Sequence, residues 1–460
     1  MAIKIDIPID VKFIINTLIH SGYEAYIVGG CVRDSILKRH PKDWDITTNA
    51  KPEQVIGLFD KVVLTGIKHG TVTVIINKEN YEVTTYRIDG EYEDNRHPKE
   101  VKFVSNLKDD LARRDFTINS MGYNEKDGLV DYFGGSQDLN NKIIRTVGEP
   151  KKRFDEDGLR ILRAIRFSAQ LNFNIDEDTL YTIKILKDNI KNISKERIRE
   201  EFNKILLSNP RKIEILKECE ILEYIISGIS NSYDFNQNNP YHIYDLYNHT
   251  ILATESIESI LHLRLTMILH DLGKIKTKTT DENGISHYYN HAKESKKIAG
   301  DILKDLKYDN YTIDKVLTLI QYHDCTLKSK LSIKRILNKI GEDLSRDLIK
   351  VQRADILAQN PLYAKERLLR LIDAEDILDL IIDKNECFNL KNLKINGETL
   401  INLGFDKGKE IGEALKYLLD IVIKNPKLNE KEELIRLAKE KLNIINSYEI
   451  KTNNNVRHNG

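Results

Sequence analysis

The chain has few cysteines and no long apolar segment, and each absence excludes some classes of protein. Its four cysteines, Cys31, Cys219, Cys325 and Cys387, are far apart and form no Cys-x-x-Cys pair. A disulfide framework or a cysteine zinc site is therefore not expected, which fits a reducing compartment. No apolar run reaches the ~18 residues of a membrane-spanning helix, and the charged start “MAIKIDIPID” lacks the core of a signal peptide. We expect a cytoplasmic protein with no membrane partner.

The chain also lacks an excess of charge of either sign, because 71 basic side chains balance 71 acidic ones. Net charge therefore does not indicate a nucleic-acid partner, and any such surface must be local. The hydrophobic share of 40% is too high for wholesale disorder. At 460 residues, a prior of roughly 100–200 residues per domain predicts between two and four domains.

The pattern of hydrophobic residues changes near residue 148. Before it, short β-branched segments bounded by turn residues predict strands, mixed with helices, in an α/β domain over 1–148. After it, nearly every segment has helical periodicity, and a polar loop at 230–242 indicates a further boundary. The predicted later divisions are helical segments at 149–235, 236–360 and 361–446, then a flexible tail at 447–460.

Two aspartates stand one residue apart in “DWDIT”. If this segment is a strand, Asp43 and Asp45 project from the same face, on either side of Trp44. Two anions that close repel unless a cation lies between them, and Mg²⁺ prefers oxygen ligands of this kind. Two-metal phosphoryl transfer uses such pairs to organise the attacking and leaving oxygens. Taken alone, the pair is more often two exposed acids at the start of a strand.

A glycine turn and an arginine precede the aspartates in “VGGCVRD”. Gly29 and Gly30 let the backbone approach a ligand closely, and Arg33 can donate charge-assisted hydrogen bonds to phosphate. Separately, these residues are typical of a tight turn and a surface helix. Together with the two aspartates they predict a site for a nucleoside triphosphate. The segment has no Gly-Lys-Ser/Thr and so differs from a Walker loop.

The segment “RFDEDGLRILRAIRF” predicts a helix on which Asp157, Arg160, Arg163 and Arg166 recur every three residues. At ~100° per residue this stripe drifts, so Asp157 and Arg166 are expected on roughly opposite sides. We therefore predict Asp157 and Arg160 on a base edge, and Arg163 and Arg166 on phosphates or RNA. A carboxylate that accepts from an exocyclic amine, beside a guanidinium that donates to the ring nitrogen, admits cytosine and adenine and rejects guanine and uracil. The alternative is a solvated, arginine-rich face.

These motifs in series resemble the class II CCA-adding enzymes, which are tRNA nucleotidyltransferases of the polymerase-β-like superfamily and are similar to bacterial poly(A) polymerases. The match runs in order over residues 22–208, and a weaker one covers 395–415. The segments that carry it are “VGGCVRD…DWDIT”, “TGIKHGTVTV”, “EVTTYRIDGEYEDNRHPKEVKFV”, “LARRDFTINSM”, “DYFGGSQDL”, “EDGLRILRAIRF”, “ISKERIREEFNKIL” and “INGETLINLGFDKGKEIGEAL”.

The resemblance implies an α+β head with a mixed sheet and helices, followed by an all-α neck, body and tail. In the head it implies that Gly30 and Arg33 hold the triphosphate, that Asp43 and Asp45 bind Mg²⁺, and that Arg114 is a further nucleotide contact. The loop after “TYRIDGEY” matches the flexible loop that the family needs to add the final A. Gly122 stands where the family is expected to have alanine, which affects no catalytic residue.

In the neck, the resemblance implies that Asp157 and Arg160 form an amino-acid template that selects CTP and then ATP. Arg163 and Arg166 match further nucleotide contacts. The implied reaction is template-independent addition of C, C and A to a tRNA 3′ end, in which the 3′-hydroxyl attacks the α-phosphate and pyrophosphate leaves. An A-adding enzyme or a poly(A) polymerase is the alternative within the class. The oligomeric state and the grip on the tRNA elbow stay open.

A histidine-rich stretch between residues 240 and 360 is absent from short members of that family. Its order resembles the HD-type metal-dependent phosphohydrolases, with core ligands at His249, His270, Asp271 and Asp355. His291 and His323 are candidates for a second metal. Imidazoles with carboxylates suit a transition metal such as Ni, Mn or Fe better than Mg²⁺ alone.

This second resemblance implies a phosphatase or 2′,3′-cyclic phosphodiesterase activity in addition to the addition of nucleotides. Two alternatives stay open: scattered or structural histidines without a reaction, and a protein that is chiefly an HD phosphohydrolase with an RNA-binding head.

Overall fold

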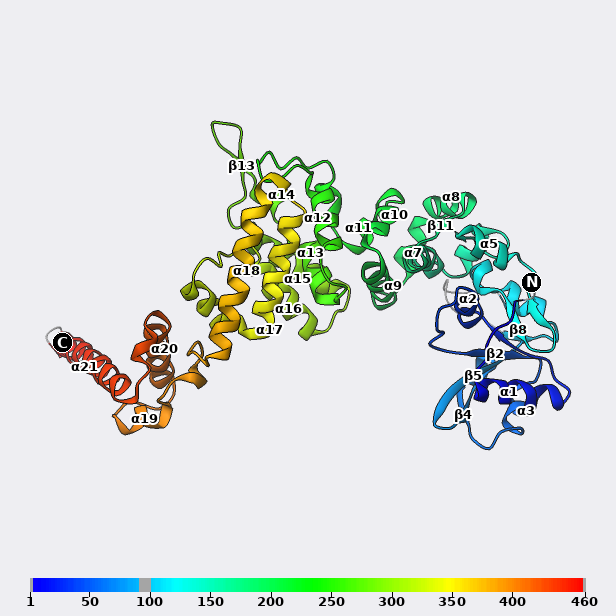
Figure 1. The fold of residues 1–460 in the computed structure, drawn as a ribbon, viewed down its shortest axis with the longest axis horizontal. Coiled ribbons are helices and arrows are strands. Elements are labelled where there is room, and N and C mark those ends of the chain that lie inside the picture. The colour runs from blue at the N-terminus through cyan, green and yellow to red at the C-terminus, as the bar shows by residue number, and fades with distance from the viewer. Residues whose placement is uncertain (1–2, 91–100, 458–460) are drawn as a thin grey trace. The chain divides into compact units, whose positions relative to one another are not determined.

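The computed structural model describes residues 3–90 and 101–457 (Figure 1). The chain divides into two compact units, Met1–Ser230 with Ile302–Tyr308, and Asn231–Asp301 with Asp309–Gly460. The loop predicted to serve addition of the final A falls largely on residues 91–100, which lie outside the described residues. Within the described ranges, none of the helices combines the length and the apolar character needed to cross a bilayer.

Among the described residues, seven strands form one mixed sheet in the order β3-β4-β5-β2-β1-β8-β9. β2 and β5 are parallel and pair Ile46 with Val83, whereas the other neighbours are antiparallel. The bounds are β1 (Ala25–Val28), β2 (Asp45–Thr48), β3 (Val62–Gly66), β4 (Thr71–Ile76), β5 (Glu79–Thr85), β8 (Gly122–Asn124) and β9 (Gly128–Val130). Shorter pairs join β6 (Arg87–Asp89) to β7 (Val101–Phe103), and β10 (Ile143–Ile144) to β11 (Asn174–Ile175). The predicted mixed head is confirmed.

Helices pack against this sheet through apolar residues spaced three or four apart. In α1 (Ile9–His20) the buried side chains include Val11, Ile14 and Leu18, which lie on one face of the helix. The other head helices are α2 (Gly30–Ile36), α3 (Pro52–Ile56), α4 (Leu107–Ala112) and α5 (Gly135–Asn141). α2 follows β1 directly, so the glycine turn lies at the end of a buried central strand.

The neck is helical, but the helix predicted to run through Asp157 is broken there. Its helices are α6 (Pro150–Glu156), α7 (Leu159–Leu171), α8 (Glu177–Ile185), α9 (Lys195–Ser208), α10 (Ile213–Glu218) and α11 (Leu222–Ile225). Asp157 is extended, and its Oδ1 accepts a hydrogen bond from the backbone N–H of Leu159 at 3.0 Å. A carboxylate that caps the next helix in this way competes with continuation of the first. The predicted angular stripe therefore holds only for the three arginines on α7.

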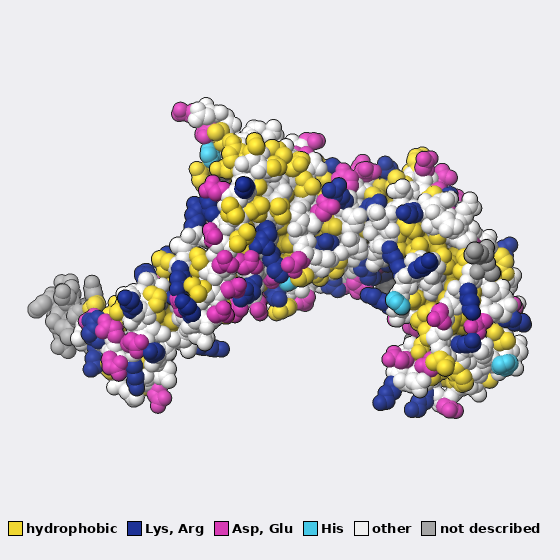
Figure 2. Space-filling model, viewed as in Figure 1, with side chains coloured by type: hydrophobic (Ala, Val, Ile, Leu, Met, Phe, Trp, Pro, Cys, Tyr) yellow, Lys and Arg dark blue, Asp and Glu magenta, His cyan; other side chains and the backbone are white. Residues whose placement is uncertain are grey.

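The second unit is helical apart from the hairpin of β12 (Thr279–Thr280) and β13 (Ser286–His287). Its first helices are α12 (Leu246–Glu255), α13 (Leu261–Leu269), α14 (Lys274–Thr277), α15 (His291–Asp305), α16 (Asn310–Tyr322), α17 (Lys330–Leu357) and α18 (Pro361–Asp383). One apolar core is shared by α12, α13, α16, α17 and α18. On the face shown in Figure 2, basic and acidic side chains are interspersed, as the balanced charge leads one to expect.

A separate apolar core is formed by α19 (Gly397–Asn402), α20 (Lys409–Lys424) and α21 (Lys431–Arg457). The prediction of a loose tail from residue 447 is wrong as far as Arg457, because α21 continues to that residue. The tail sequence is rich in asparagine, which has only modest helix propensity, but no proline or glycine interrupts it before Gly460.

Candidate nucleotide and metal sites

The glycine turn, the second aspartate and an arginine converge in the head. Gly29 has a φ of 79°, and a Cβ placed on it would lie 3.0 Å from Nη1 of Arg114 and 3.7 Å from Oδ2 of Asp45. Any other residue there would be strained and would crowd the arginine. Gly30 begins α2, and Asp45 begins β2 with Asp43 two residues earlier. The structure thus brings together the predicted residues of the turn and the carboxylate pair.

The carboxylates are placed so that a cation would stabilise them. Asp45 keeps an exposed face, but the protein atoms around its carboxylate displace enough water to raise its pKa. Arg114 opposes this shift, and the negative charge of Asp43 adds to it. A set of oxygen donors with raised proton affinity fits a hard divalent cation such as Mg²⁺.

A third carboxylate, Glu82, was missed by the reasoning from sequence. The parallel register that pairs Ile46 with Val83 also places Glu82 on β5 next to Asp45 on β2. Loss of water raises the pKa of Glu82, and the charges of Asp45 and Asp43 raise it further. Glu82 opens the motif “EVTTYRI”, but only the pairing of two strands far apart in sequence shows that it joins the site.

Arg33 is fixed by neighbouring side chains rather than free on a surface helix. Its Nε and Nη2 donate to the two carboxylate oxygens of Asp34 at 2.9 and 3.0 Å, and its Nη1 donates to Oδ1 of Asn119 at 2.7 Å. Arg114 lies 3.5 Å from Oδ2 of the fully buried Asp110. Both predicted nucleotide contacts therefore have an internal partner that limits where the guanidinium can move.

The predicted base-reading pair is held apart by other partners. Oδ2 of Asp157 accepts from Nη2 of Arg197 at 2.9 Å. Arg160 lies 2.5 Å from a carboxylate oxygen of Glu156 and donates to the backbone oxygen of Arg113 at 3.2 Å. Arg197 was missed because it is 40 residues from Asp157, and only the packing of α9 beside α7 brings them together.

The remaining two arginines of α7 differ from each other. Arg163 is about one-third exposed and binds Oδ2 of Asp115 through Nε and Nη2, at 2.8 and 2.6 Å. Arg166 is 8% exposed and pairs with Glu201 of α9 at 2.5 Å. Arg166 thus ties α7 to α9 in the free protein, and its contact with phosphate or RNA stays a prediction. A three-residue spacing could not distinguish a solvent-facing arginine from one turned inward.

In the second unit, the residues predicted to form a metal core lie together although they come from three segments. One ligand atom from each of His249, His270, Asp271 and Asp355 lies within 4.8 Å of the others, and Asp271, His291 and His323 form a second such group. The histidines stand in α12, directly after α13, at the start of α15 and directly after α16.

All four histidines turn the same ring atom toward the backbone. Nδ1 of His270, His291 and His323 lies 2.7 to 2.8 Å from the carbonyl oxygen three residues earlier, and Nδ1 of His249 lies 3.2 Å from that of Ala358. A carbonyl can only accept, so Nδ1 carries the proton. Nε2 of each ring then faces the cluster, as in metal-ligating histidines, and Nε2 of His291 lies 3.1 Å from Nε2 of His323.

In this arrangement, histidine nitrogens and carboxylate oxygens, which both carry lone pairs, face one another. Nε2 of the buried His249 lies 3.1 Å from Oδ1 of Asp355 and 3.4 Å from Oδ2 of Asp271, yet it makes no hydrogen bond among the described residues. Burial disfavours protonation of His270, but the negative charges of Asp271 and Asp355 outweigh it and raise its pKa to about 10. The cluster thus requires a positive charge, supplied by protons or by a metal ion, and its nitrogen and oxygen donors fit a transition metal.

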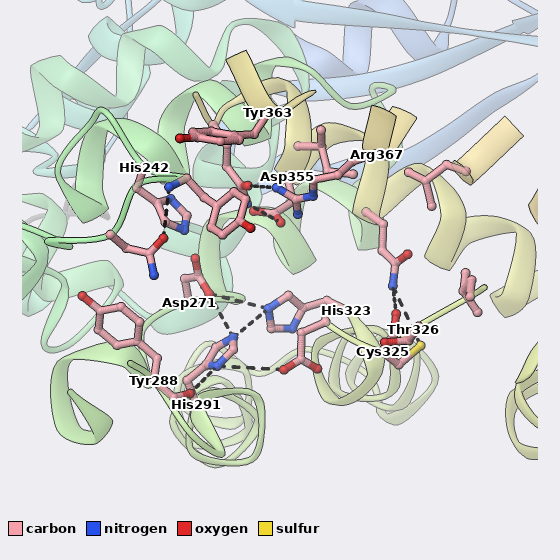
Figure 3. Close-up of a pocket in the computed structure, with 18 of the residues that line it drawn as sticks. His242, Asp271, Tyr288, His291, His323, Cys325, Thr326, Asp355, Tyr363 and Arg367 are labelled. Atoms are coloured by element: carbon pink, nitrogen blue, oxygen red, sulfur yellow. Dashed lines mark hydrogen bonds and ion pairs between the residues drawn. The ribbon is translucent and has the colours of Figure 1, made fainter. Parts of the chain in front are cut away.

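Asp271 belongs to both groups and lies between them. Its Oδ2 faces His249 and His270 at 3.4 and 3.1 Å, and its Oδ1 lies 3.5 Å from Nε2 of both His291 and His323. Figure 3 shows Asp271, His291 and His323 directed toward one another. One carboxylate therefore serves two neighbouring sets of ligands.

Four residues of the cluster line an open pocket of about 730 Å³, namely Asp271, His291, His323 and Asp355. Arg367 donates to Oε1 of Gln359, whose Nε2 donates to Oδ2 of Asp355 at 2.8 Å, so a cation of the wall is linked to a predicted ligand (Figure 3). Lys274 is buried and lies 2.6 Å from Asp271. The pocket is also lined by exposed tyrosines and further cations, namely Tyr241, Tyr289, Tyr363, Lys328 and Arg370. The reasoning from sequence missed Tyr363, Arg367 and Arg370 because α18, which carries them, has no recognisable motif.

Comparison with known proteins covers both units. Family models match in three places: the “Poly A polymerase head domain” at residues 25–145, the “RNA and SrmB-binding site of polymerase A” at 172–232, and domain 2 of tRNA nucleotidyltransferase at 276–438. None of these descriptions names an HD domain.

Curated relatives are similar over different lengths. The CCA-adding enzyme of Lactobacillus helveticus is 52% identical over 200 residues, which cover 44% of this chain and 50% of that one, so this alignment spans about half of the relative. The CCA-adding enzyme of Staphylococcus epidermidis is 33% identical over 433 residues, 92% of this chain and 96% of that one. The crystal structure of the Bacillus stearothermophilus CCA-adding enzyme in complex with CTP superposes with a TM-score of 0.71 at 27% identity, covering 95% and 98% of the two chains. This chain belongs to the family of CCA-adding enzymes.

Proposed function

We propose that this protein adds C, C and A to tRNA 3′ ends from CTP and ATP, without a nucleic-acid template. The observation that carries the proposal is the convergence of Asp43, Asp45 and Glu82 with Gly29 and Arg114 in a chain of this family. The Bacillus stearothermophilus relative, solved in complex with CTP, supports a pyrimidine nucleotide as one substrate.

In the proposed reaction, the 3′-hydroxyl of the tRNA attacks the α-phosphate and pyrophosphate leaves. Mg²⁺, when held by Asp43 and Asp45, would stabilise the charge that develops on the attacking and leaving oxygens. Arg33 and Arg114 donate to the triphosphate, and their internal partners keep both guanidinium groups oriented before it arrives. Gly29 and Gly30 leave room for the phosphates beside Asp45.

Base selection rests on the neck. Asp157 accepts from the exocyclic amine of cytosine or adenine, and Arg160 donates to the adjacent ring nitrogen. Arg197 and Glu156 hold these two side chains in the free protein and position them for the base. Arg163, partly exposed and fixed by Asp115, is placed to contact the nucleotide as well. The predicted segments 1–148 and 149–235 thus divide the work between chemistry and selection.

A second candidate function is phosphoester hydrolysis in the helical unit, and the common orientation of four histidines favours it. Nε2 of the buried His249 and His270 faces the carboxylates of Asp271 and Asp355 at 3.1 to 3.5 Å, which is the donor set that a metal ion would share. His249, His270, Asp271 and Asp355 would hold a transition metal, and His291 and His323 would complete a second position beside Asp271. Such a metal supplies Lewis-acid activation of water and of the phosphoryl group.

The wall of this pocket favours a nucleotide ester over a small phosphomonoester. Tyr241 and Tyr363 lie with ring centroids 5.0 Å apart, and the guanidinium of Arg367 lies 5.6 Å from the ring of Tyr241. Exposed aromatic rings with cations are the surface on which single-stranded bases and phosphates bind. A phosphate or cyclic phosphate at an RNA end is the substrate that this chemistry fits.

The nucleotidyltransferase proposal is tested with tRNA that ends before its CCA. With Mg²⁺, CTP alone should extend it by C residues, CTP with ATP should complete CCA, and ATP alone should add nothing. Asp45→Asn should lower the rate by more than about 100-fold, since even outer-shell partners of a metal contribute 10–100-fold. Asp60→Asn, an exposed head aspartate, is the control. Incorporation of A without C, or of neither, would overturn the proposal.

Metal binding by the helical unit is tested on the chelator-treated full-length chain by calorimetric titration with Mn²⁺ or Ni²⁺. His249→Ala and Asp355→Asn should each weaken binding by about 100-fold or more, because each removes a direct ligand. The control is His262→Ala in the same unit, whose Nε2 lies 2.7 Å from Asp347 away from the cluster. Equal affinities in all four proteins would show that the cluster does not bind metal.

The two active sites should be separable by mutation. With Mn²⁺ or Ni²⁺, an RNA with a 2′,3′-cyclic phosphate end should be hydrolysed by the wild type and by Asp45→Asn, but not by Asp271→Asn, while Asp271→Asn should still add CCA. Thin-layer separation of the RNA ends measures both reactions. Absence of hydrolysis in the wild type, or its loss in Asp45→Asn alone, would contradict the second function.

A further inference from the structure

A single aromatic ring lies among three arginines at the junction of the head and the neck. The guanidinium carbons of Arg166, Arg33 and Arg163 lie 3.8, 5.1 and 5.6 Å from the centroid of the Phe167 ring. The ring is 5% exposed, and its edge packs against the fully buried Phe116 at 5.6 Å. A phenylalanine in a protein core needs no cation beside it, because apolar neighbours would bury its ring equally well. Three guanidinium groups around one ring therefore indicate a role beyond packing.

Two of these arginines are also joined by a route that avoids the ring. Arg33 donates to Asn119 at 2.7 Å, and Nδ2 of Asn119 donates to Oδ1 of Asp115 at 3.1 Å. The other oxygen of Asp115 accepts from Arg163 at 2.8 Å. The contacts therefore form a closed ring that runs from Arg33 through Asn119, Asp115, Arg163 and Phe167 back to Arg33.

This closed ring connects the two halves of the nucleotide site. Arg33 lies on α2, which follows the glycine turn of the head, and Arg163 lies on α7, which carries Arg160 three residues earlier. Asp115 has a pKa well below its ordinary value, because Arg163 and Asn119 outweigh the effect of burial, so it stays ionised. The ionised carboxylate fixes Arg163. Among the described residues, the side chain of Arg33 is hydrogen-bonded to Asp34 and Asn119 and faces the Phe167 ring.

We infer that Phe167 is a positioning residue that holds Arg33 ready for the triphosphate and keeps the neck helix in register with it. The inference rests on the proposed nucleotidyltransferase function. The flat face of the ring attracts the guanidinium without competing for its N–H groups, so those that Asp34 and Asn119 leave unused remain available to phosphate. An aliphatic side chain of similar volume would fill the space and lose this attraction.

The Phe167 ring acts through Arg33 on the triphosphate rather than on the base. Its removal should therefore weaken the binding of CTP and of ATP alike. In Phe167→Leu we expect KM for CTP and for ATP to rise together by about fivefold, the factor of one partly desolvated cation–π contact, with kcat retained. Phe167→Tyr keeps the aromatic face and should stay within about twofold of the wild type. Calorimetric binding of CTP to the free protein reads the same effect without turnover.

The matched control is Phe173→Leu, since Phe173 is 4% exposed in the same unit and its ring meets no cation among the contacts of the described residues. The melting temperature of each variant reports packing separately, and Phe167→Met replaces Phe167→Leu if the latter does not fold. Equal KM values for Phe167→Leu and the wild type, or an equal rise in Phe173→Leu, would overturn the inference. Wild-type protein that adds no nucleotide at all would instead overturn the function on which it rests.

Discussion

The two sites of this protein depend on one constraint. The fold holds together side chains that repel one another unless a cation lies between them. In the head, strand pairing places Glu82 beside Asp45, and the pKa of each carboxyl is raised by the loss of water and by its neighbours. In the helical unit, histidines whose Nδ1 atoms are engaged by the backbone turn Nε2 toward Asp271 and Asp355. Folding bears the cost of this repulsion, and a metal ion relieves it.

The sites differ in how open they are, and that difference fits their proposed tasks. The carboxylates of the head are exposed. Exposure is needed at a site that receives a nucleotide and an RNA end and then releases a longer RNA. The histidine cluster is buried at the base of a pocket, where less water competes for the ligands. The contacts around Phe167 connect Arg33 to α7. They thus link the residues proposed for chemistry to those proposed for base selection.

Much of this was predictable from sequence, and the failures have physical causes. The mixed head is confirmed because it depends on local pattern, whereas the strand expected to carry both aspartates begins only at Asp45, so the two-residue repeat does not place Asp43. Glu82 and Arg197 were not predictable, because each reaches its site through pairing or packing of segments far apart in sequence. The break at Asp157 was missed because a helical period of apolar residues continues across it, while the carboxylate itself ends the helix by capping the next one.

The central claim is that amino acids of the neck, rather than a nucleic acid, choose the base. The most direct test gives the wild type and Asp157→Ala the same tRNA lacking CCA, with each of the four nucleoside triphosphates in turn, and measures kcat/KM for the first addition. The account predicts that Asp157→Ala reduces the preference for CTP over UTP by at least about tenfold, since one hydrogen bond to a charged group contributes roughly 1.5–3 kcal/mol. A variant that retains wild-type preference would contradict the account.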